Sequence, residues 1–137
     1  NASALVNMGF ADVRSVMRAG GVAAIGVGTS EDSDSRKRSM EAVTRALNHP
    51  LLEVDYQGAT GALIQIVGGD DLRLDDINVI GEAVQRNLDP QAMVKIGARI
   101  DENFKHKVHV ITIITGVKSP FILGPAAKRF SPSKMAG

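Results

Sequence analysis

The chain has 137 residues and a mass of 14.5 kDa, and its 44% apolar and 23% charged residues suit one compact domain with a tail, not a disordered chain. A net charge of +1 is too weak for non-specific binding to nucleic acid, and the lack of cysteine excludes disulfides, thiolate nucleophiles and Cys-ligated zinc. No apolar run is long enough for a transmembrane helix, and no signal segment is visible. These exclusions leave a cytoplasmic globular domain.

The first half of the chain predicts two helices and one strand. Apolar residues recur at helical spacing over 10–18, and Ala19-Gly20-Gly21 ends this first helix. Residues 22–27 form a short apolar run bounded by glycines, which is typical of a buried strand. A polar stretch over 29–35 offers N-caps for a second helix, which Pro50 closes. The predicted apolar stripe of that helix is Met40, Ala42, Val43, Ala46 and Leu47.

The second half predicts a strand, a helix and two further strands. Residues 62–67 form a strand stopped by Gly68-Gly69, and the following helix ends at Asp89-Pro90. Its buried face is predicted to hold Ile77, Ile80, Val84 and Leu88. Residues 93–100 predict a half-exposed strand, and the β-branched run 108–115 predicts the last one.

These elements predict an α+β fold. After the first helix the order is β-α-β-α-β-β, which we interpret as two βαβ-like steps followed by a hairpin. The expected result is a four-stranded mixed sheet with two helices on one face. From residue 118 the composition changes to three prolines, four basic residues and no acid, which indicates an extended tail where only Phe121-Ile122-Leu123 docks. The predicted units are therefore 1–20, 21–117 and 118–137.

Several residue patterns suggest chemistry but favour structural interpretations. Gly26-Val27-Gly28 begins like a dinucleotide fingerprint, but Glu31 replaces the third glycine, which favours a plain strand-end turn. The spacing of His106 and His109 points them to opposite faces of a strand, and His49 suits a helix end. The acids Asp70, Asp71, Asp75 and Asp76 are typical of a helix start, and Ser33, Ser35 and Ser39 lack a histidine partner. No metal site is predicted.

The residues around the first helix carry a more specific signal. Asp12 falls in the first turn of that helix, where physical chemistry alone favours a helix-stabilising role. However, Asn7-x-x-Phe10-Ala11-Asp12-Val13-Arg14 resembles the signature loop and following helix of FtsZ, the tubulin-like cell-division GTPase family. The likeness continues, in order, through the motifs Gly20-Gly21-Val22-Ala23, Ala46-Leu47-Asn48-His49-Pro50-Leu51-Leu52, Gly58-Ala59-Thr60-Gly61-Ala62-Leu63, Asp71-Leu72-Arg73-Leu74 and Thr115-Gly116-Val117.

This resemblance covers about positions 5–117 and implies the C-terminal domain of the family, in its archaeal form. In that family an N-terminal domain holds GTP, and the loop of one subunit enters the GTP pocket of the next. Asp12 then matches a loop aspartate that positions the attacking water, and Asn7 matches the loop asparagine. Gly9 replaces the usual first loop aspartate, which removes one carboxylate near that water. Five residues are implied at the subunit interface: Phe10, Leu72, Arg73, Leu74 and Asp75.

The resemblance also implies the cofactor and the partners. GTP, which magnesium could accompany, would be bound by the absent N-terminal domain and a neighbouring subunit, so the isolated chain is expected to be inactive. Self-association into filaments is expected, with a division adaptor on the tail, no nucleic acid and no direct membrane insertion. The expected location is the cytoplasmic division ring. Two alternatives stay open: a non-catalytic cytoskeletal paralogue, which Gly9 favours, and a stand-alone small-molecule-binding α+β module.

Overall fold

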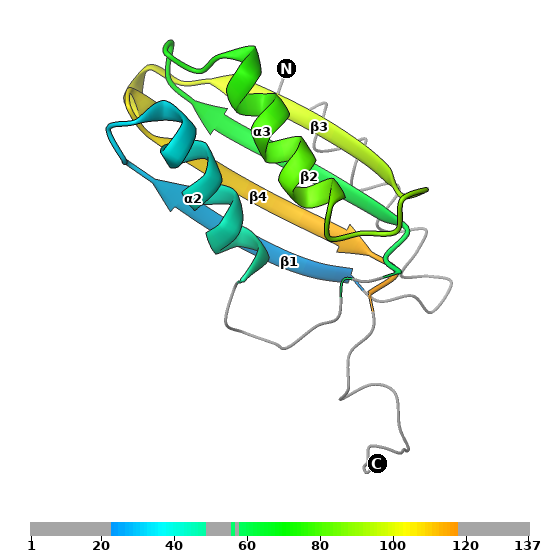
Figure 1. Cartoon of the computed structure of the whole chain (residues 1–137). Helices are drawn as coiled ribbons and strands as arrows, with labels where there is room; N and C mark the ends of the chain where they lie inside the picture. The colour runs from blue at the N-terminus through cyan, green and yellow to red at the C-terminus, as the bar shows by residue number, and fades with distance from the viewer. Residues whose placement is uncertain (1–22, 49–55, 57, 118–137) are drawn as a thin grey trace.

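The computed structural model describes residues 23–48, 56 and 58–117. They form β1 (Ala23–Ser30), α2 (Ser35–Leu47), β2 (Gly61–Gly68), α3 (Leu74–Gln85), β3 (Met93–Ile100) and β4 (Val108–Thr115), with a short 3-10 helix η1 (Glu102–Phe104) before β4. Figure 1 shows both helices lying over the same face of one sheet. The α+β prediction of a four-stranded mixed sheet with two helices on one face is confirmed, and the first predicted helix lies outside the described residues.

The order of the strands is β1-β4-β2-β3, with β2 and β3 parallel and β4 antiparallel to both β1 and β2. The predicted hairpin between the last two strands is therefore wrong, because β4 lies between β1 and β2 and does not touch β3. A central strand is paired with a neighbour along each of its two edges, so most of its side chains are buried. The β-branched, apolar sequence of β4 suits that central position. β3 carries Lys95 and Arg99 and stays at the edge.

The core lies between the helices and one face of the sheet. From the sheet it takes Ile64, Ile66, Val110 and Ile114, and from the helices Ala42, Val43, Ala46, Ile80, Ala83 and Val84. The predicted stripe of α2 needs one correction, since Met40 is 37% exposed while Arg38 and Ser39 are buried. Met40 lies one residue past the centre of the stripe, which is about 100° around the helix. Neither helix in the described part of the chain is long and apolar enough to cross a membrane.

Gly26 and Gly28 allow α2 to lie very close to β1. A Cβ atom on Gly26 would overlap the carbonyl oxygen of Ala46, and one on Gly28 would overlap that of Ala42. The predicted strand-end turn at these glycines is wrong, because β1 continues in register with β4 as far as Ser30. The Gly-Val-Gly pattern is therefore a feature of helix–sheet packing, and its backbone is covered on the helix side.

Candidate functional site

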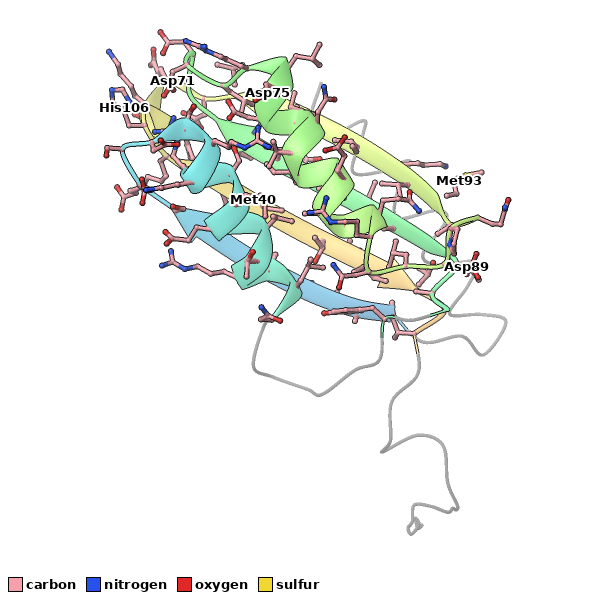
Figure 2. All side chains as sticks on the ribbon, viewed as in Figure 1. Met40, Asp71, Asp75, Asp89, Met93 and His106 are labelled. Carbon is pink, nitrogen blue, oxygen red and sulfur yellow. The ribbon has the colours of Figure 1, made fainter. Side chains whose placement is uncertain are left out.

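The site residues predicted from the sequence divide into two groups. Asn7, Gly9, Phe10 and Asp12 lie outside the described residues. The structure places the other group, residues 72–75, in the connection from β2 to α3 and the first turn of α3. Figure 2 shows Asp71 and Asp75 at this end of the molecule, close to His106, and Met93 at the opposite end. We refer to residues 72–75 as the α3-start segment.

The α3-start segment has one buried anchor and an exposed tip. Leu72 is partly buried against the core, and its N–H donates to the carbonyl oxygen of Gly69 at 3.0 Å. Arg73, Leu74 and Asp75 are exposed, and Leu74 exposes 72% of its surface. An apolar side chain so exposed on an ordered helix start is available for contact with another surface.

Asp76 fixes the start of α3. Its side chain is buried, and its two carboxylate oxygens have different partners. Oδ2 accepts from the backbone N–H of Arg73 at 2.9 Å, and Oδ1 accepts from the Ser39 hydroxyl of α2 at 3.0 Å. The first contact satisfies a free N–H at the helix start, where an acid also suits the helix dipole. The helix-start interpretation of Asp76 is confirmed, and α2 is tied to the α3-start segment.

Arg38 of α2 holds the other end of the segment. Its guanidinium is buried, with Nη2 3.2 Å from Oδ2 of Asp71 and Nη1 donating to the carbonyl oxygen of Asp32 at 3.1 Å. His106, between η1 and β4, lies on the same carboxylate, with Nδ1 3.3 Å from Oδ2. Asp71 therefore joins three segments that are far apart in the sequence.

The charge on Asp71 is favoured by its surroundings. Burial acts to raise the pKa of Asp71, but hydrogen bonds from the backbone N–H groups of Asp71 and His106 and the positive charges of Arg38 and His106 outweigh it, so the pKa lies below its ordinary value. The carboxylate is thus ionised at neutral pH and attracts the Arg38 guanidinium. His106 has a positive φ of 57°, which is uncommon for a residue other than glycine.

The other polar residues considered as site candidates, His109 and Asp75, each contact a neighbouring side chain of this domain. His109 lies 2.7 Å from the Thr29 hydroxyl through Nδ1, on the side of the sheet away from the helices. His106 precedes β4 and its ring contacts Asp71, so its direction does not follow from the predicted strand spacing. Asp75 pairs with Arg36 at 3.8 Å. Among the described residues no group of three or more His, Asp or Glu side chains is arranged to hold a metal ion.

A cavity of about 540 Å³ lies at the opposite end of α3, and no sequence signal pointed to it. It is lined by Tyr56, Gly58, Arg86, Asn87, Leu88, Asp89 and Pro90. Tyr56 donates its hydroxyl to the carbonyl oxygen of Leu47 at 2.8 Å, and burial raises the pKa of this phenol. The lone tyrosine therefore secures the end of α2 beside the cavity.

Comparison with known proteins identifies the family. Residues 21–118 match the model of the FtsZ family, C-terminal domain. The chain belongs to the FtsZ family. It is 52% identical over 124 residues to Cell division protein FtsZ 2 of Methanocaldococcus jannaschii, in an alignment that covers 90% of this chain and 33% of that protein. The resemblance to an archaeal FtsZ C-terminal domain, drawn above from the sequence motifs, is confirmed.

Solved FtsZ structures agree with this membership. A mutant FtsZ from M. jannaschii has a TM-score of 0.68 at 49% identity, over 79% of this chain and 32% of that one. A second structure from the same organism, described as an FtsZ dimer, has a TM-score of 0.67 at 50% identity, over 78% of this chain and 30% of that one. This FtsZ-family domain thus spans about a third of the length of the relatives that it matches.

Proposed function

We propose that this chain is the C-terminal, GTPase-activating and polymer-forming part of an FtsZ-like cell-division protein. Asp12 would orient the water that attacks GTP held between an N-terminal domain and the neighbouring subunit, and Asn7 would set the loop. Phosphoryl transfer depends on such positioning more than on covalent chemistry. The family match and the 52% identity to a cell division protein support this function. The division ring in the cytoplasm is the corresponding location.

GTP does not fit the described residues alone. The glycine pattern closest to a phosphate-binding loop, Gly26-Val27-Gly28, lies inside β1 with Ala42 and Ala46 of α2 against it. Its backbone therefore has no room to approach a phosphate. This agrees with a division of labour in which the nucleotide, with any accompanying magnesium, is held by other parts of the full-length protein.

The exposure of Leu74 at a fixed helix start is the observation that supports the proposed role in polymer formation. Arg38 and Ser39, both buried in α2, hold Asp71 and Asp76 on either side of the α3-start segment. A segment fixed in this way loses little conformational entropy when a neighbouring subunit binds to it. The segment matches the positions that the family places near the subunit interface, so Leu74 would be its apolar contact.

Assembly of the full-length protein tests this assignment, with a matched control inside the same domain. Leu74→Asp should raise the critical concentration for GTP-dependent sedimentation about tenfold, because it places a charge in an apolar contact. Met93→Asp is the control, since Met93 is similarly exposed, at 66%, but lies at the opposite end of the sheet. Equal critical concentrations for the two variants would place the interface elsewhere.

Gly9 supports a second candidate function, that of a non-catalytic cytoskeletal paralogue. Only one of the two loop aspartates of the family, Asp12, is present in this sequence. Such a protein would form filaments but hydrolyse GTP very slowly. Turnover measured on assembled full-length protein separates the two functions. A division adaptor that binds the basic tail, residues 118–137, fits either one.

A further inference from the structure

The two edges of the sheet differ in their protection. β1 and β3 are the edge strands, and among the described residues each pairs with one neighbour only. β3 carries Lys95 and Arg99, which is how natural sheets discourage pairing with another strand. β1 has the sequence AAIGVGTS over eight residues, with no charge and no proline. It therefore offers an unprotected edge for a further strand.

The ladder shows which backbone groups of β1 face outward. In an antiparallel pair, alternate residues direct both backbone groups toward the partner and the others direct both away. The carbonyl oxygen of Thr29 accepts from Arg45 of α2 at 2.6 Å, so Thr29 faces outward. The carbonyl oxygen of Thr115 accepts from the N–H of Thr60 on the other side of β4, so its partner Ala23 also faces outward.

Ala23, Ile25 and Val27 consequently present their N–H and C=O groups along the free edge of β1. No described residue pairs with these groups. The side chains of Ile25 and Val27 are 63% and 40% exposed, and they lie on the sheet face opposite the helices. A strand added here would satisfy the backbone and cover both apolar side chains.

A second copy of this chain fits the edge poorly. Paired strands lie about 4.8 Å apart, whereas packed helices need about 8–10 Å between their axes. Gly26 and Gly28 bring α2 directly onto β1, so pairing two β1 strands would force two α2 helices together. The occupant is therefore an extended segment that carries no helix of its own.

We propose that residues 121–124 of this chain's own tail pair with the free edge of β1. Thr115, at the end of β4, lies opposite Ala23, so the chain leaves the sheet where β1 begins. The free edge is two strand spacings from β4, about 10 Å. The four residue steps from Val117 to Phe121 span up to about 13 Å. The tail can therefore reach the edge and run along it parallel to β1.

The composition of the tail agrees with this partner. Residues 119–127 contain no charge, as does β1, and Phe121-Ile122-Leu123 is their apolar and strand-favouring part. Pro120 and Pro125 limit the pairing to the four residues between them, a length close to that of the stretch from Ala23 to Val27. Alternation places Phe121 and Leu123 on one face, where Ile25 and Val27 are exposed.

Amide hydrogen exchange of two truncated forms of the 137-residue chain tests the pairing. Truncation after Lys118 should accelerate exchange at Ile25 and Val27 about tenfold, because their N–H groups lose acceptors. Truncation after Pro125 keeps the pairing segment and should leave their exchange unchanged. Amides of Val110 and Thr112, inside the sheet, serve as an internal reference in both forms.

Substitutions in the full chain give an independent measurement. Phe121→Asp combined with Leu123→Asp should accelerate the same two amides, whereas Phe130→Asp, outside the segment, should not. Unchanged exchange in the shorter truncation and in the double variant would overturn the pairing. Protection that rises with protein concentration would also overturn it, because β1 would then be paired between copies.

Discussion

The buried guanidinium of Arg38 lies 3.2 Å from the carboxylate of Asp71, although the two residues are 33 positions apart in the sequence. Only 5% of the Arg38 side chain is exposed, against 28% for Asp71. The pair therefore connects the interior of α2 to the connection that precedes α3, and Ser39 with Asp76 makes a second link beside it. These two links set the position of the α3-start segment.

Removing Arg38 should destabilise the domain more than removing a neighbouring exposed arginine. Arg38→Ala leaves the Asp71 carboxylate partly buried beside a cavity, and we expect a loss of about 2 kcal/mol in the free energy of unfolding. Arg36→Ala removes an exposed ion pair with Asp75 and should cost less than about 0.5 kcal/mol. Urea unfolding measures both. Equal losses would contradict a structural role for the buried pair.

Two glycines should respond to alanine in opposite directions. Gly26→Ala forces α2 away from β1, since the new Cβ overlaps the carbonyl oxygen of Ala46, and should cost at least about 2 kcal/mol. Gly81 lies inside α3, and a Cβ there meets only the end of the Ile96 side chain at 2.9 Å. Because alanine favours helix, Gly81→Ala should add about 0.5 kcal/mol. Thermal unfolding of both variants gives the two signs.

The sequence predicted the elements better than their arrangement. The strands 93–100 and 108–115 match β3 and β4, because alternation and β-branching are local signals. The insertion of β4 between β1 and β2 depends on which strand is most apolar on both faces. The hairpin prediction instead treated two strands that are consecutive in the sequence as neighbours in the sheet. Strand order is thus decided by burial over the whole sheet.

Only those residues of the candidate site that belong to a family motif were predicted from the sequence. Residues 72–75 came from the FtsZ resemblance, and the structure shows what holds them in place. The links from Arg38 to Asp71 and from His106 to Asp71 join residues more than 30 positions apart, so no local pattern could reveal them. Arg38 looks like part of a solvated basic helix start in the sequence, and its burial depends on the packing of α2 against α3.

His109 should make stability depend on pH. Burial, together with the nearby charge of Lys107, lowers the pKa of His109 below its ordinary value of 6.5. As the pH falls below about 6.5, the unfolded chain takes up this proton before the folded chain does. The free energy of unfolding therefore decreases between about pH 6.5 and the lower pKa of the folded state, and the full contribution of His109 is present above about pH 6.5. Urea midpoints measured between pH 5 and 8 should therefore rise with pH.

Two glutamine variants separate this effect from that of the second histidine. His109→Gln can keep a hydrogen bond with Thr29 but carries no titrating proton, so the pH slope due to this residue should vanish. His106→Gln should keep that slope, because the His109 environment is unchanged. A slope that persists in His109→Gln would show that another group is responsible.

The 137-residue chain by itself should neither bind nor hydrolyse GTP. The described residues offer no phosphate-binding loop, because the Gly26-Val27-Gly28 backbone is covered by α2. Calorimetric titration with GTP and magnesium should show no heat of binding at micromolar concentrations. Micromolar affinity would mean that residues of this chain form a nucleotide site of their own.

In the full-length protein, Asp12→Ala should abolish most GTP turnover and leave nucleotide binding intact, because in the proposed function Asp12 acts on GTP held by the neighbouring subunit. Loss of a water-positioning group commonly costs about 10²-fold or more in rate. Gly9→Asp should raise turnover, since it restores a carboxylate where the family usually has one. Both rates must be measured above the assembly concentration, because the proposed site forms only between subunits. Wild-type turnover by assembled Asp12→Ala filaments would contradict the proposed role of Asp12 in hydrolysis.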